Sequence, residues 1–117
     1  MNDRDSAPVA YARFTMAIAA ISISPLGVGI SVSAYVAAAL EVLEAQDEVL
    51  WELDSMFTTL EGEPDALFAV IQKMQEAVFA AGAERVGTVI KMDDRRDRPG
   101  ITRADKVASA RAKLSGG

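Results

Sequence analysis

The sequence predicts an α+β fold in which one antiparallel sheet carries two helices on one face. Residues 16–24, 49–63 and 85–93 hold short runs rich in β-branched and aromatic residues, bounded by glycine and proline, which is typical of strands. Residues 31–46 and 65–81 repeat apolar side chains every three or four positions, which is typical of amphipathic helices. Because the middle strand segment is long enough for a hairpin, the order is β-α-β-β-α-β. This is the split βαβ plan of ferredoxin-like folds, here with an extra C-terminal helix.

The first predicted strand alternates between apolar and polar side chains. Ile21 and Ile23 fall on one face, Ser22 and Ser24 fall on the other, and Pro25 ends the strand. The stretch PLGVG then supplies glycines for a loop. The segments VLWELDSM and FTTLEGE predict two short strands joined tightly.

Each predicted helix carries a start or stop signal. Ser31 or Ser33 is expected to cap the first helix, whose predicted buried face is Val32, Tyr35, Val36, Ala39, Leu40 and Leu43. Pro64 suits the first position of the second helix, and Gly82 suits its end. The predicted buried face of that helix is Leu67, Val70, Ile71, Met74 and Val78. Thr102 and Asp105 form a capping pair for a last helix that ends near Leu114.

Length and composition limit the classes of function. A chain of 117 residues suits one domain, and we expect residues 16–117 to form it after a flexible extension at 1–15. The chain has no cysteine and no histidine, so disulfides, zinc–thiolate sites and Ser-His-Asp catalysis are excluded. A net charge of −5 disfavours nucleic acid as a partner. The apolar run at 16–23 is too short to span a membrane, and no signal peptide is evident, so we expect a cytoplasmic protein.

The charged stretch IKMDDRRDRP is the most conspicuous motif. As a calcium loop counted from Asp93, it would need glycine at the sixth position and glutamate at the twelfth, where Arg98 and Ala104 stand. As a nucleic-acid clamp it lacks interleaved aromatic residues, and its aspartates neutralise its arginines. The stretch is therefore expected to be an ion-paired turn at the end of the last strand or at a subunit contact.

Two less conspicuous groups of polar residues remain as candidate sites. Glu61 and Glu63 could share a strand face as an acid–base pair, although two exposed carboxylates at a strand end are the simpler interpretation. Hydroxyls around PLGVG could bind a small polar group, although capping accounts for at least one of them. No metal ligand set and no cofactor motif accompanies either group.

Four segments together resemble the family of small thiamine-binding proteins. They are SISPLG in the first strand, SVSAYVA at the first helix, SMFTTLEG in the hairpin and ERVGTVIKMDDRRD at the last strand. The last of these is the most specific. The resemblance implies a ferredoxin-like subunit that assembles into homodimers or homotetramers through its sheets. It also implies binding of thiamine or its hydroxymethylpyrimidine half, without known chemistry.

The resemblance also implies which residues bind the ligand. The positions that match the family's ligand-binding residues are Ser22, Ser33, Met56, Thr58 and Glu61. Phe57 stands where the family usually has glycine, so its ring either fills part of the pocket or stacks on the ligand. Val28 is a second departure beside the expected site. The sequence thus predicts a non-enzymatic carrier or sensor. The alternative is a structural or regulatory oligomer with a degenerate pocket, which acts through protein contacts.

Overall fold

The computed structural model describes residues 16–97 and 102–116, so the predicted extension at 1–15 lies outside the described residues. Within these described residues, seven elements follow one another. They are β1 (Ala17–Pro25), α3 (Ser33–Glu44), β2 (Leu50–Leu53), β3 (Thr58–Gly62), α4 (Pro64–Ala80), β4 (Val86–Asp94) and α5 (Arg103–Gly116). The predicted β-α-β-β-α-β order with a last helix is confirmed.

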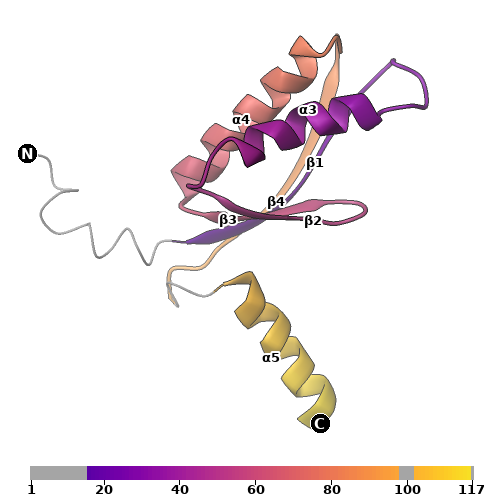
Figure 1. Ribbon diagram of the computed structural model, residues 1–117. Coiled ribbons are helices and arrows are strands. Elements are labelled where there is room, and N and C mark those ends of the chain that lie inside the picture. Colours follow the sequence, from indigo (N-terminus) through magenta and orange to yellow (C-terminus); the bar gives the residue numbers. More distant parts are fainter. Residues whose placement is uncertain (1–15, 98–101, 117) are drawn as a thin grey trace, which may run out of the picture.

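The four strands form one sheet in the order β2-β3-β1-β4, and every neighbouring pair is antiparallel. The long strands β1 and β4 pair along nine residues, whereas β3 covers only the first part of β1. Helices α3 and α4 lie on the same face of this sheet (Figure 1). The predicted α+β class is therefore confirmed.

The core lies between the sheet and these two helices. Side chains of β1 alternate, so Ala17, Ala19 and Ile21 are buried on the helix side. Leu60 of β3 meets them there, since its Cα pairs with that of Ala19. From the second helix, every residue of the predicted buried face is buried, which confirms the period-3.6 pattern.

Helix α4 also has the predicted signals at both ends. Pro64 is its first residue, where the missing N–H costs no helical hydrogen bond. Gly82 follows the helix with φ +119°, and its N–H donates to the carbonyl of Phe79 at 3.0 Å. A side chain at this φ would be strained, which explains why glycine ends the helix.

Helix α3 departs from the sequence prediction in two respects. Its cap residue is Val32, which makes no side-chain cap hydrogen bond, so the predicted serine cap is wrong. Ser33 is already the first helical residue. Its hydroxyl therefore does not precede the backbone N–H groups of the first turn, which have no hydrogen-bond partner within the helix. In addition, only Ala39 and Leu43 of its predicted face are buried, while Val32 and Val36 are exposed. In the first turns of α3, Tyr35 still packs against the core, whereas Val32 and Val36 do not.

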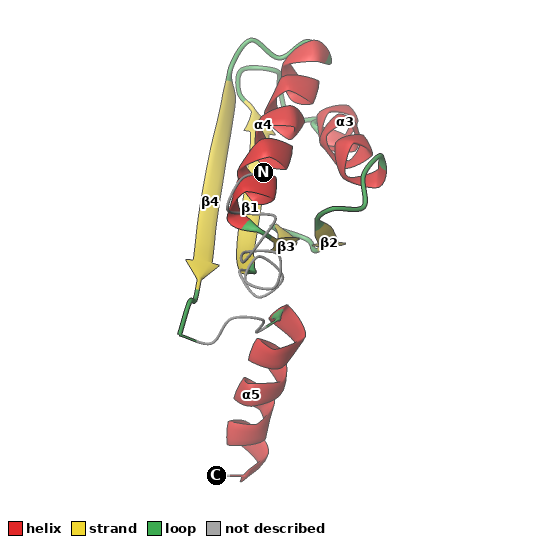
Figure 2. Cartoon of the chain, turned by 90° about the vertical axis from the view of Figure 1, so that its left-hand side faces the viewer, coloured by secondary structure: helices red, strands yellow, loops and turns green. Residues whose placement is uncertain are grey.

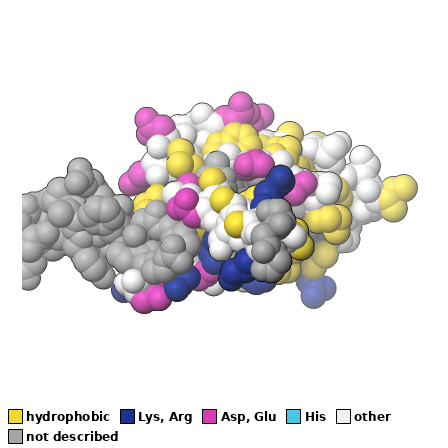
Figure 3. Space-filling view, turned by 90° about the horizontal axis from the view of Figure 1, so that it is seen from below, with side chains coloured by type: hydrophobic (Ala, Val, Ile, Leu, Met, Phe, Trp, Pro, Cys, Tyr) yellow, Lys and Arg dark blue, Asp and Glu magenta, His cyan; other side chains and the backbone are white. Residues whose placement is uncertain are grey.

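Helix α5 projects away from the sheet and the other two helices (Figure 2). Its predicted capping pair is confirmed, because Thr102 N–H donates to Asp105 Oδ2 at 2.9 Å and Asp105 N–H donates to Thr102 Oγ1 at 3.1 Å. Lys106 in its first turn pairs with Asp93 of β4. In the view from below, basic side chains gather where α5 lies, with acidic side chains around them (Figure 3).

The charged run after β4 is the predicted ion-paired turn. Arg95 pairs with Asp97 at 2.7 Å, and Arg96 pairs with Asp94 at 2.8 Å. The hydrogen bond to Asp97, together with its negative charge, raises the pKa of Arg95 above its usual value. Since these side chains are largely in water, the turn positions the chain more than it stabilises the fold.

Candidate functional site

A pocket opens on the helix side of the sheet, between β1, the turn that joins β2 to β3, and the middle of α3. We call it the helix-side pocket. Its volume is about 320 Å³, at the lower end of the ~300–1,000 Å³ that is usual for small-molecule sites. Val36 and Leu40 of α3 form part of its wall, together with Met74 of α4. Val36, which the sequence predicts to be in the core, thus borders this pocket.

The pocket exists because β3 is shorter than β1. The register between them ends at Ile21 with Thr58, whereas β1 continues beside β4 as far as Pro25. Beyond Ile21, within the described residues, the edge of β1 that faces away from β4 carries no partner strand. Consecutive residues of β1 therefore border the pocket, and Ser22, Ile23 and Ser24 all line it.

The turn between β2 and β3 closes the other side of the pocket. Asp54, Ser55, Met56, Phe57 and Thr58 line it in succession. The turn is fixed by a hydrogen bond of 3.0 Å from the N–H of Asp54 to the carbonyl of Phe57. The lining thus combines hydroxyls with a thioether and one aromatic ring. Such a surface suits a flat ring that carries polar groups on its edge.

Four of the six residues predicted to bind a ligand meet at this pocket. Ser22 comes from β1, and Met56, Phe57 and Thr58 come from the hairpin. Phe57 is 38% exposed, so its ring borders the pocket without being sealed inside the protein. Ser33 and Val28 are not among the residues that line it.

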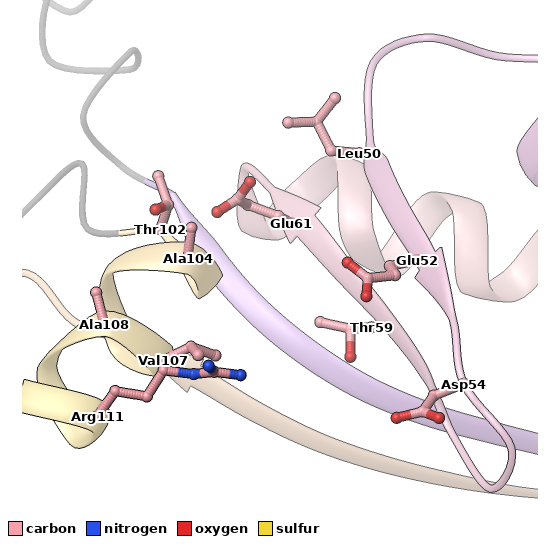
Figure 4. Close-up of a pocket in the computed structure, with 10 residues that line it drawn as sticks. All are labelled: Leu50, Glu52, Asp54, Thr59, Glu61, Thr102, Ala104, Val107, Ala108 and Arg111. Atoms are coloured by element: carbon pink, nitrogen blue, oxygen red, sulfur yellow. The ribbon is translucent and has the colours of Figure 1, made fainter. Parts of the chain in front are cut away.

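Glu61 lies on the opposite face of the sheet. It lines a second depression, the outer cleft, which runs between the outer face of the hairpin and α5 (Figure 4). This cleft has a volume of about 790 Å³. Leu50, Glu52, Asp54, Thr59 and Glu61 line it from the hairpin, and Thr102, just before α5, lines it with Ala104, Val107, Ala108 and Arg111 of α5.

Strand geometry separates Glu61 from the helix-side pocket. Thr58 and Leu60 point to the helices, so Thr59 and Glu61 point outward. Glu61 is only 3% exposed although it lies on the outer face. The predicted acid–base pair is not formed on a shared strand face either, because β3 ends at Gly62 and Glu63 is the cap residue of α4.

Asp54 is the charged residue among the pocket residues that the sequence prediction missed. It directly follows β2 and lines both the helix-side pocket and the outer cleft. Its only signal in the sequence is its place two residues before Met56, in the turn between two strands. Only the structure, in which this turn closes a pocket, shows that Asp54 lies beside a possible ligand site.

Neither a metal site nor a membrane-spanning helix is found in the described part of the chain. In residues 16–97 and 102–116, no group of three or more acidic side chains is arranged to hold a metal ion. Among the helices of the same residues, none is long and apolar enough to cross a membrane.

Comparison with known proteins defines the class to which this fold and site belong. Residues 19–111 match the family model described as thiamine-binding protein. The Bacillus subtilis protein YqgV, of the UPF0045 group, is 45% identical over 103 residues, which is 85% of this chain and 98% of YqgV. A UPF0045 protein of Methanothermobacter thermautotrophicus is 43% identical over 101 residues, covering 85% of this chain and all of its own length.

Solved structures agree with these sequence matches. The crystal structure of MJ1052 from Methanocaldococcus jannaschii superposes with a TM-score of 0.74 at 33% identity, over 82% of this chain and 96% of that one. A domain of unknown function from Bacillus cereus superposes with a TM-score of 0.73 at 36% identity, over 87% of this chain and 96% of that one. The chain belongs to the thiamine-binding protein family, which confirms the resemblance found in its sequence.

Proposed function

We propose that this protein is a non-enzymatic, oligomeric carrier or sensor that binds thiamine or its hydroxymethylpyrimidine half in the cytoplasm. The helix-side pocket is the proposed binding site. One observation carries the proposal: Ser22, Met56 and Thr58, which match the family's ligand-binding positions, come from β1 and from the hairpin and line one pocket, together with Phe57. Membership of the thiamine-binding protein family supports the choice of ligand.

The chemistry of the lining suits an aminopyrimidine. Such a ring presents nitrogen acceptors and an amino donor on its edge. The hydroxyls of Ser22 and Thr58 both donate and accept hydrogen bonds, so they complement either group. Met56 and Phe57 offer apolar, polarizable surface against the flat face of the ring.

An oligomer is proposed because the outer face of the sheet retains apolar surface. Val89 of β4 is 56% exposed and Leu50 of β2 is 53% exposed. Val89 pairs with Ser22, and Leu50 pairs with Glu61, so both point away from the core. A second copy packed on this face would remove these side chains from water, which stabilises association.

Calorimetric titration of the full chain with thiamine and with hydroxymethylpyrimidine tests the proposed ligand. We expect saturable heat from both compounds and none from the thiazole half alone. Thermal unfolding in the same buffers should show stabilisation, since a ligand at one hundred times its Kd adds about 2.7 kcal/mol. Absence of heat and of any Tm shift at millimolar thiamine would overturn the proposal. An oligomer that binds neither compound would instead favour the alternative function through protein contacts.

A further inference from the structure

Asp54 gives the helix-side pocket a negative charge that the sequence motifs of the chain do not predict. Among the described residues that line the pocket, Asp54 is the only charged one. Its neighbours there are hydroxyl, thioether, aromatic and aliphatic groups. A single carboxylate in such surroundings dominates the local electrostatic potential, and it attracts cations.

The local geometry holds this carboxylate at the turn. Asp54 Oδ1 accepts a hydrogen bond of 2.7 Å from the N–H of Ser55, while the N–H of Asp54 donates to the carbonyl of Phe57 at 3.0 Å. A carboxylate has about four acceptor positions on its two oxygens, so the bond to Ser55 leaves capacity for a ligand. Asp54 is therefore oriented by its own turn beside Phe57.

The other carboxylate expected at the ligand does not reach this pocket. Glu61 points to the outer face of β3, opposite Thr58, and it is not among the residues that line the helix-side pocket. Asp54 lines both the outer cleft and the helix-side pocket, so among the described residues it is the carboxylate available to a positively charged ligand in the helix-side pocket.

We propose that Asp54 is a specificity-determining residue, which makes the pocket prefer a positively charged heteroaromatic ligand over a neutral one of similar shape. This inference rests on the proposed function and adds that the preferred ligand carries a positive charge. The carboxylate attracts the cationic part of the ligand, while Met56 and Phe57 contact the rings. Because Asp54 is exposed, the attraction is screened by salt and has a moderate size.

The substitution Asp54→Asn isolates the charge. An asparagine keeps an oxygen that can accept the N–H of Ser55, so the turn is retained while the charge is lost. Glu52→Gln is the matched control. It removes the same charge from β2 at a position that lines the outer cleft and not the helix-side pocket. Circular dichroism of both variants verifies that each is folded.

Calorimetric titration with thiamine, a fixed cation, and with neutral hydroxymethylpyrimidine tests the inference at low and at moderate salt. We expect Asp54→Asn to weaken the binding of thiamine about fivefold and the binding of hydroxymethylpyrimidine by less than about twofold. The substitution should also reduce the salt dependence of thiamine binding. Glu52→Gln should leave both affinities within about twofold of the unsubstituted protein.

Three results would overturn the inference while leaving the proposed function intact. They are unchanged thiamine affinity in Asp54→Asn, an equal loss for the charged and the neutral ligand, and the same charge-selective loss in Glu52→Gln. If the unsubstituted protein binds neither compound, the proposed function fails, and this inference fails with it.

Discussion

Thr58 and Glu61 lie three positions apart on β3, and their side chains leave opposite faces of the sheet. Thr58 pairs with Ile21 and lines the helix-side pocket, whereas Glu61 pairs with Ile18 and lines the outer cleft. An odd separation along a strand always has this result, because successive side chains alternate. A small ligand therefore meets one of the two residues of a given chain, and we assign that role to Thr58.

Replacing Glu61 with glutamine tests this assignment. We expect Glu61→Gln to leave thiamine affinity within about twofold, because the carboxylate is separated from the pocket by the sheet. The thermal midpoint should fall, since the side chain is buried and engaged in polar interactions. Titration below the unfolding range measures the first effect and calorimetric unfolding measures the second. A tenfold loss of thiamine affinity in a folded Glu61→Gln variant would contradict this assignment and show that Glu61 contributes to binding.

Replacing Phe57 with alanine distinguishes the two roles that its ring could have. We expect Phe57→Ala to weaken thiamine binding by about 1 kcal/mol, because the partly exposed ring lines the proposed pocket and a ring stacked on a ligand contributes about this much. If the ring instead fills space that the ligand needs, affinity will rise. Phe57→Leu, which keeps an apolar side chain at the same place in the turn, is the control for altered turn geometry.

Gln46 fixes the connection between α3 and β2. Its Nε2 donates to the carbonyls of Leu43 and Val49 at 3.0 and 2.9 Å, and its Oε1 accepts the N–H groups of Glu48 and Val49 at 2.9 and 2.7 Å. We expect Gln46→Ala to lower the free energy of unfolding by about 1–3 kcal/mol, because main-chain groups lose their partners.

Chemical denaturation measures this loss. Gln72→Ala on the exposed side of α4 is the control, and it should change stability by less than about 0.5 kcal/mol. Equal stability of the two variants would contradict the structural role of Gln46.

The capping pair of α5 makes a separate prediction. Thr102→Ala removes the hydroxyl that accepts the N–H of Asp105, which costs about 1 kcal/mol of helix stability. Hydrogen exchange in the first turns of α5 should accelerate about fivefold, while exchange in β1 stays unchanged. Unchanged exchange in α5 would show that contacts elsewhere hold this helix.

The fold was predictable because its signals are local. The 17-residue α4 shows five buried positions at helical spacing, with proline at its start and glycine after its end, and all of these were predicted. The capping pair at Thr102 and Asp105 was predicted for the same reason, since both residues lie within one turn. Local patterns of this kind need no knowledge of the tertiary structure.

The site was only partly predictable because it depends on where strands stop. Ser22, Met56, Phe57 and Thr58 were predicted through the family resemblance, and the structure brings them to one pocket. Val36 was expected in the core, but it borders the pocket that the short β3 leaves open. Asp54 was missed because nothing in the sequence shows that its turn closes this pocket.

Chemical-shift mapping of threonine and methionine methyl groups tests the location of the ligand most directly. Thr58 and Thr59 are adjacent on β3, but Thr58 lines the helix-side pocket and Thr59 lines the outer cleft. On addition of thiamine, we expect the methyl signals of Thr58 and Met56 to shift and that of Thr59 to stay in place. A shift of Thr59 with Thr58 and Met56 unmoved would contradict the assignment of the helix-side pocket as the binding site.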